Sequence, residues 1–155
     1  MVIHRAEYYP VNSGIENHVE QLSNLYKRGY SICVFPEGTR SDDCSILRFH
    51  KGAFYLAQQL KADVLPIYLH GVGHVLPKRD FMLRQGRIDM EVGRRMTTPL
   101  TPTANGQEPP DLLDFTRKMR HHYQEHYRQM CERLETPEYW TPYRRLEQYY
   151  KIDLT

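Results

Sequence analysis

The stretch Val34-Phe35-Pro36-Glu37-Gly38-Thr39-Arg40-Ser41 decides the fold. It ends an apolar run, residues 30–35, whose β-branched and aromatic side chains are typical of a buried strand. Pro36 cannot donate a hydrogen bond to a sheet, so we expect the strand to end there. Gly38 permits a positive φ or the close approach of a ligand, and the planar Arg40 guanidinium matches a phosphate or carboxylate. The stretch therefore predicts a ligand loop at the carboxyl end of a strand.

The residues before this stretch predict a strand followed by a helix. Residues 6–11 can form a short strand that ends near Pro10. Ser13 and Glu16 match a capping box, and apolar side chains at helical spacing continue until Lys27, Arg28 and Gly29 close the helix. A strand, a helix and a strand joined by short connections predict parallel pairing through a right-handed crossover.

The residues after the stretch alternate between helical and extended patterns. We expect a helix over 52–61, a strand over 64–69 that Pro66 interrupts, and a hairpin formed by 81–83 and 88–92. Four prolines in 97–110 indicate a linker. Asp111 can cap a long helix that reaches about Leu134, and Thr136-Pro137 and Thr141-Pro142 predict two further helix starts.

These elements predict an α/β fold in which helices flank a parallel or mixed sheet. We expect an incomplete α/β core over 1–96, a linker over 97–110 and a helical C-terminal extension over 111–155 that packs on the core. A length of 155 residues suits one hydrophobic core, and 40% hydrophobic and 26% charged residues are ordinary for a globular domain.

The charge and the cysteines exclude several classes of protein. A formal net charge of +2 gives no support to a nucleic-acid partner. No apolar run is long enough for a membrane span, and the first residues do not resemble a signal peptide. The three cysteines, Cys33, Cys44 and Cys131, form no CxxC pair, which favours free thiols in a reducing compartment.

Three segments together resemble the glycerophosphate and lysophosphatidate acyltransferase family. Residues 35–41 look like the third signature block of that family, residues 49–54 are similar to its segment before the next helix, and residues 64–67 resemble its fourth block. Their order and spacing also match, which makes the resemblance far more specific than any one block.

The first block of the family, a His followed five positions later by an Asp, is absent from this sequence. None of the eight histidines has an Asp at that distance. The second block falls near residues 6–11, where the arginine that the family often has is missing. The chain therefore resembles the C-terminal part of an acyltransferase, and we expect no catalytic residue of that family and little activity in this chain alone.

The resemblance implies transfer of a fatty acyl group from acyl-CoA or acyl-ACP to a hydroxyl of a glycerol-phosphate lipid or lysophospholipid. It implies a substrate site formed by Glu37, Gly38, Thr39 and Arg40, with Arg40 on the phosphate. Lys51, beside Arg48 and His50, can extend the positive charge of that site. It further implies no metal and no cofactor beyond the acyl thioester co-substrate. A cytoplasmic location at the inner face of the cytoplasmic membrane and a membrane-surface partner also follow, while the oligomeric state stays open.

Each of these assignments has an alternative. Arg40 can be a surface arginine paired with Glu37 or Asp42, and the cations around Lys51 can be a solvated face. His50 can act as a replacement base only if it reaches the reacting hydroxyl. For Leu65 and Ile67 we prefer ordinary core packing to a position along the acyl channel.

Two other classes of protein compete with the enzyme. A non-catalytic lipid- or phosphate-binding module needs Arg40 and Lys51 but no base. A zinc peptidase is the other, because residues 122–126 match H-x-x-E-H; we favour a solvated helix face there, since a third zinc ligand is not evident. The aromatic residues 139–150, interleaved with arginine, suit either a membrane-interface anchor or, as we prefer, packing on the domain.

Overall fold

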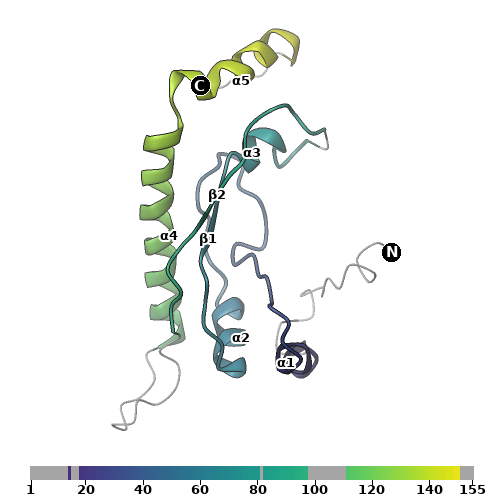
Figure 1. Ribbon diagram of the computed structural model, residues 1–155, viewed down its shortest axis with the longest axis vertical. Helices are drawn as coiled ribbons and strands as arrows, with labels where there is room; N and C mark the ends of the chain where they lie inside the picture. Colours follow the sequence, from purple (N-terminus) through teal and green to yellow (C-terminus); the bar gives the residue numbers. More distant parts are fainter. Residues whose placement is uncertain (1–13, 15–17, 81, 98–110, 151–155) are drawn as a thin grey trace.

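The computed structural model describes residues 14, 18–80, 82–97 and 111–150, and the side chains of these residues up to 144. The elements in chain order are α1 (Val19–Lys27), α2 (Gly52–Leu60), β1 (Ile67–His70), α3 (Val72–Val75), β2 (Asp89–Val92), α4 (Leu112–Leu134) and α5 (Pro137–Tyr150). In Figure 1, α4 runs alongside the two strands, α5 crosses its end near α3, and α1 and α2 lie toward the opposite end. The predicted strand 6–11, the capping box at Ser13 and Glu16 and most of the predicted linker lie outside the described residues.

The described sheet is an antiparallel pair. Ile67 pairs with Val92 and His70 with Asp89, so β1 and β2 are in register over four residues. A bridge between Val64 and Met96 prolongs the ladder on the other side of Pro66. The hairpin prediction was therefore wrong in its pairing, because 88–92 joins the earlier strand 64–69 instead of 81–83. Among the described residues, 82 and 83 form no strand.

The segment 30–35 is not a strand in the structure, which corrects the prediction from its composition. Val34 is 39% exposed and Phe35 is 70% exposed, and no β-ladder joins the segment to the described residues. Residue propensity gives a strand only where a neighbour supplies hydrogen-bond partners, and β1 pairs with β2 instead. The predicted parallel crossover is accordingly not seen in the described part of the chain.

Local signals placed the helix ends well. The backbone N–H of Gly29, which has φ +89°, donates to Tyr26, and that of Tyr30 donates to Leu25, so the chain reverses at the predicted glycine. The Asp111 side chain accepts a hydrogen bond from the N–H of Leu113 and caps α4 as expected. The two helix starts predicted at Thr136 and Thr141 are instead one helix, α5, with Pro142 inside it.

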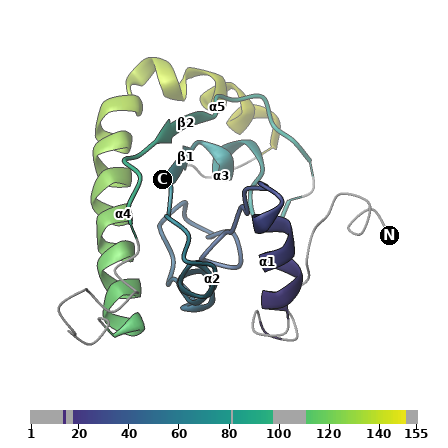
Figure 2. The same ribbon diagram turned by 60° about the horizontal axis from the view of Figure 1, so that its bottom comes forward.

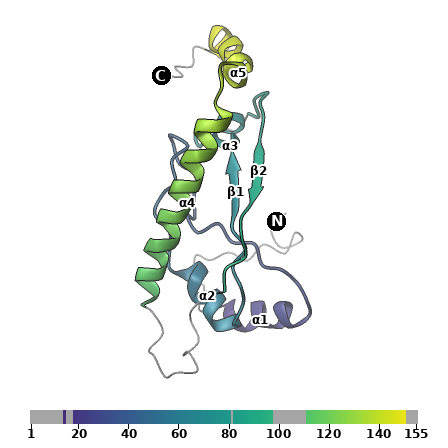
Figure 3. The same ribbon diagram turned by 60° about the vertical axis from the view of Figure 1, so that its left-hand side comes forward.

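The core lies between α2, α4 and the segment that precedes α2. Phe49, Phe54 and Met119 are almost fully buried, and the Phe54 ring meets that of Phe115 edge-on with centroids 5.5 Å apart. Figure 3 shows α4 alongside one face of the β1–β2 pair, and Figure 2 shows α1 beside α2. On β1, Tyr68 is buried toward α4, while Ile67 faces outward.

Three aromatic residues in the first part of the C-terminal helix pack on the domain. Tyr139 and Tyr143 are buried, and the ring of His74 in α3 meets that of Trp140 edge-on with centroids 4.9 Å apart. This confirms packing for these three aromatic residues; Tyr149 and Tyr150 have no described side chains. No helix among the described residues is long and apolar enough to cross a membrane.

Candidate functional site

The loop 36–41 is held in place by the segment that leads into α2. The N–H of Gly38 donates to the Phe35 carbonyl across a tight turn, where Gly38 has φ +68°. The Glu37 carboxylate accepts a hydrogen bond from the N–H of Leu47 at 2.7 Å, and the Pro36 carbonyl accepts one from the N–H of His50 at 2.8 Å. Glu37 therefore braces the loop, whatever further contact it makes with a ligand.

Gly38 has the positive φ that the sequence suggested for a glycine. Its positive φ disfavours an L side chain, and a Cβ built there would lie 3.4 Å from the His50 ring. The structure thus places an exposed imidazole against the loop. Thr39 makes one long contact, 3.5 Å from its hydroxyl to the Arg40 carbonyl, which is too long to count as a strong cap.

Arg40 binds the chain itself. Its Nη1 donates to the carbonyl oxygens of Leu76 at 2.8 Å and Pro77 at 3.1 Å, and its Nη2 to that of Lys78 at 3.3 Å. These carbonyls follow α3, so the guanidinium fixes the loop to the end of that helical turn. The alternative that Arg40 pairs with Glu37 or Asp42 is wrong in this structure: Asp42 binds Lys78 and Arg79.

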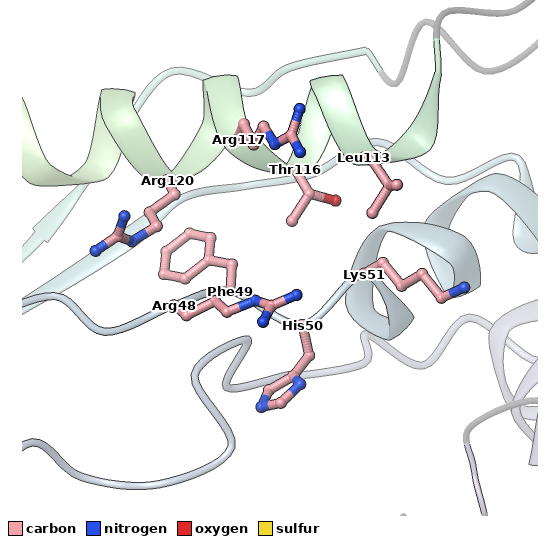
Figure 4. Close-up of a pocket in the computed structure, with 8 residues that line it drawn as sticks. All are labelled: Arg48, Phe49, His50, Lys51, Leu113, Thr116, Arg117 and Arg120. Atoms are coloured by element: carbon pink, nitrogen blue, oxygen red, sulfur yellow. The ribbon is translucent and has the colours of Figure 1, made fainter.

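Lys51 lies at a separate basic pocket. A cavity of about 600 Å³ opens between residues 48–51 and the first turns of α4. It is lined by Arg48, Phe49, His50, Lys51, Leu113, Thr116, Arg117 and Arg120. Figure 4 shows Arg117 on α4 and Arg48 along the opposite segment, whereas the His50 ring points away from α4. The sequence grouped Lys51 with Arg48. The structure adds Arg117 and Arg120 to the same pocket, which the sequence did not predict.

Arg117 and Arg120 were not predicted as site residues, because the helical pattern of 111–134 was interpreted only for its apolar face. Positions 113, 116, 117 and 120 form a second stripe, next to the stripe of Leu112, Phe115 and Met119 that enters the core. This helical spacing could have indicated a second functional face of α4. The sequence did not reveal which segment that face would contact. Arg120 donates to the Leu47 carbonyl at 2.8 Å and ties the two walls together.

A second missed cluster surrounds His70, which is fully buried. Its Nε2 lies 2.8 Å from the Glu135 carboxylate, and its Nδ1 has no partner among the described residues. His70, Cys131 and Glu135 are the one group in the described residues whose ligand atoms are close enough for a metal ion, all within 4.8 Å of one another. Burial, followed by the Glu135 charge, raises the pKa of Cys131 to about 12, which keeps the thiol protonated. The cluster fits a hydrogen-bonded junction between β1 and α4, and a metal would first have to displace that proton.

The histidines of the zinc-peptidase alternative have protein partners. The Nε2 of His122 lies 3.0 Å from the Tyr68 hydroxyl, and the Nε2 of His126 lies 2.9 Å from the Glu91 carboxylate. The two side chains thus contact β1 and β2 at different points. His122 and Glu125 are exposed, as the predicted solvated face requires, while His126 is half-buried. The pair is also not part of the metal-competent group among the described residues.

Comparison with known proteins agrees with the family resemblance of the loop 36–41, the signature loop. Residues 2–70 match the family model described as Acyltransferase. Over these residues the chain is similar to the acyltransferase family. It is 37% identical over 101 residues to a 1-acyl-sn-glycerol-3-phosphate acyltransferase of Chlamydomonas reinhardtii, covering 64% of this chain and 28% of that protein. It is 31% identical over 102 residues to the alpha form from Ovis aries, covering 66% of this chain and 33% of that protein.

A solved structure has a similar fold over most of this chain. The crystal structure of the 1-acyl-sn-glycerophosphate (LPA) acyltransferase from Thermotoga maritima matches with a TM-score of 0.53 and 24% identity, over 74% of this chain and 45% of that one. The predicted class, an α/β fold with a helical C-terminal part, is confirmed. The match spans about a third of the length of the curated relatives.

Proposed function

We propose that this acyltransferase chain serves the transfer of a fatty acyl group from a thioester carrier, coenzyme A or acyl carrier protein, to a hydroxyl of lysophosphatidate or a related glycerol-phosphate lipid. The observation that carries the proposal is the signature loop 36–41, present in sequence and held rigidly by residues 47–50 and 76–78. A rigid loop positions an acceptor at little entropic cost, and positioning can supply a large part of a rate enhancement.

Each loop residue has a proposed role in binding the acceptor. Glu37 and Gly38 shape the acceptor site, and Thr39 lines it. Arg40 neutralises the acceptor phosphate with the donors its own contacts leave: a guanidinium has five N–H groups, and three are used on the carbonyls of Leu76, Pro77 and Lys78. Lys51 adds positive charge from the start of α2.

An exposed apolar surface on β1 and β2 suits the acyl chain. Leu65, Ile67 and Leu69 are 45%, 42% and 38% exposed, so the expectation that Leu65 and Ile67 pack in the core was wrong for the described structure. On the neighbouring strand, Met90 and Val92 continue the same outward face. Apolar surface of this kind gains free energy on contact with a fatty chain.

The chemistry needs a general base that takes the acceptor hydroxyl proton while the oxygen attacks the thioester carbonyl. The C–O bond forms, the C–S bond breaks, and the proton passes to the departing thiolate. The His-x4-Asp pair of the family is absent from this sequence. We therefore propose that the chain by itself has little turnover. We also propose that it works without metal or further cofactor, as a peripheral protein at the inner face of the cytoplasmic membrane.

An assay of free thiol release tests the proposal. The 155-residue chain is compared with a version extended upstream to include a His-x4-Asp segment, with acyl-CoA as donor and lysophosphatidate as acceptor. We expect turnover in the extended protein and almost none in the short one. Full activity in the short chain would refute the missing-base argument, and loss of that activity in His50→Gln would identify the replacement base.

The second candidate is a non-catalytic lipid- or phosphate-binding module. The basic pocket favours it, because binding of this kind needs positive charge but no general base. The same assay separates the two functions. An extended protein that binds lysophosphatidate but never releases thiol supports the module, and turnover rejects it.

A further inference from the structure

The basic pocket between residues 48–51 and α4 is distinct from the signature loop. Arg117 lies outside residues 2–70, the part of the chain that the family model matches. The loop contacts the segment before α2 through His50, whereas the pocket opens on the α4 side of that segment. A ligand in the pocket would thus meet Arg48, Arg117 and Arg120, to which the proposed function gives no role.

The positive charges of the pocket are not balanced. Its eight lining residues include three arginines and one lysine and no acid. Within the described residues, Arg48, Lys51 and Arg117 have no ion-pair partner, while the nearby Asp114 binds Lys118 and Asp111 caps α4. Like charges that share a cavity repel one another, and a bound anion removes that repulsion.

The walls of the pocket are fixed before any ligand arrives. Phe49 and Thr116 in its lining are 4% and 6% exposed, and Arg120 donates a hydrogen bond from α4 to the Leu47 carbonyl on the opposite wall. Preorganisation of this kind lowers the entropic cost of binding. The Arg48 and Arg117 guanidinium groups therefore start from a defined frame on two separate elements.

We propose that this pocket binds a phosphomonoester, with Arg48 and Arg117 on the phosphate and Lys51 at the rim. Guanidinium forks match phosphate oxygens, and a cavity of about 600 Å³ also has room for an organic group beside Leu113 and Phe49. This assignment of the ligand rests on the proposed function. Two of its reactants carry a phosphomonoester: lysophosphatidate, and coenzyme A through its 3′-phosphate.

Titration calorimetry on the 155-residue chain tests the site and separates the two sources. Glycerol 3-phosphate and monomeric lysophosphatidate represent the acceptor, while coenzyme A compared with dephospho-coenzyme A represents the donor. We expect saturable binding of at least one phosphomonoester. Preference for the first pair identifies the acceptor and reassigns its phosphate from Arg40 to this pocket. Loss of affinity in dephospho-coenzyme A identifies the donor, and both outcomes support the site.

Matched variants show whether the pocket is responsible. Arg117→Gln is expected to weaken binding at least about tenfold, because a charge-assisted hydrogen bond contributes about 1.5–3 kcal/mol. Arg117→Lys should retain part of the affinity, and Arg48→Gln with Arg117→Gln should abolish it. Lys118→Gln removes the same charge from the next residue, outside the pocket, and should change affinity less than about twofold. Circular dichroism and thermal melting of each variant confirm that it folds.

Three results would overturn the site. One is no saturable binding by the folded wild-type chain. Another is an equal loss in Lys118→Gln and Arg117→Gln, which means general electrostatic attraction. The third is binding that Arg40→Ala removes and Arg117→Gln leaves intact; in that case the phosphate lies at the signature loop, and the proposed function stands without this pocket.

Discussion

The Nη1 of Arg40 lies 2.8 Å from the carbonyl oxygen of Leu76, 36 residues further along the chain. This contact, with the bonds to Pro77 and Lys78, turns the arginine of the signature loop into a clamp on the end of α3. The residue that the family resemblance assigns to a phosphate is therefore also a structural residue. Its two roles can be separated by experiment.

Arg40→Ala is expected to lower the free energy of unfolding by about 1 kcal/mol, because exposed charge-assisted hydrogen bonds stabilise only modestly. Amide exchange of residues 76–80 should rise at the same time. Urea denaturation and hydrogen exchange measure the two effects. Arg79→Ala is the control, since Arg79 is 89% exposed and contacts only Asp42 among the described residues. Unchanged stability and exchange in Arg40→Ala would mean that the clamp contributes nothing.

Phe54→Ala should cost about 3–5 kcal/mol of unfolding free energy, because the ring is 4% exposed and leaves a cavity between Phe49 and Phe115. Phe35→Ala removes the same side chain from a site that is 70% exposed and should change stability by less than about 0.5 kcal/mol. Denaturant melts of the two variants give the comparison. Equal costs would show that 30–35 is buried in solution, as its composition predicted.

Acidification should destabilise the protein through His74. Burial lowers the pKa of His74, Glu135 opposes this and His70 adds to it. Because the folded pKa lies below the unfolded value of about 6.5, the unfolded state binds more protons between the two. The stability contribution of His74 is therefore complete above pH 6.5 and is lost as the pH falls toward the folded pKa.

His74→Gln should flatten this part of the pH dependence, although it also weakens the contact with the Tyr139 hydroxyl at 3.0 Å. Unfolding free energies between about pH 8 and 5 measure the slope. His121→Gln, at an exposed position of α4, is expected to retain the wild-type slope. A slope that survives in His74→Gln would assign it to another group.

The three thiols should react in a fixed order with iodoacetamide at pH 8. Cys33 is exposed, whereas burial raises the pKa of Cys44 and raises that of Cys131 to about 12. Since the thiolate is the nucleophile, Cys131 should react at least about a hundredfold more slowly than Cys33. Mass spectrometry of timed samples measures the rates, and in urea the three should converge. Fast labelling of folded Cys131 would contradict the hydrogen-bonded junction with Glu135.

Part of this structure was predictable because it depends on neighbours in the sequence. The chain reversal at Gly29, the Asp111 cap and the positive φ of Gly38 are set by residues a few positions apart, and the signature loop is identified by its own letters. The same local signals correctly placed α2 and α4.

Tertiary structure alone decided which distant groups meet. The propensity of 30–35 for a strand could not reveal that β1 pairs with β2, because a strand is stable only with a partner that supplies its hydrogen bonds. In the same way, the sequence did not reveal that Arg40 contacts the carbonyls of residues 76–78, or that Arg117 lines the same pocket as Arg48. A side chain's type fixes what it can bind, and only the packing of α4 and α3 against the loops fixes what lies within its reach.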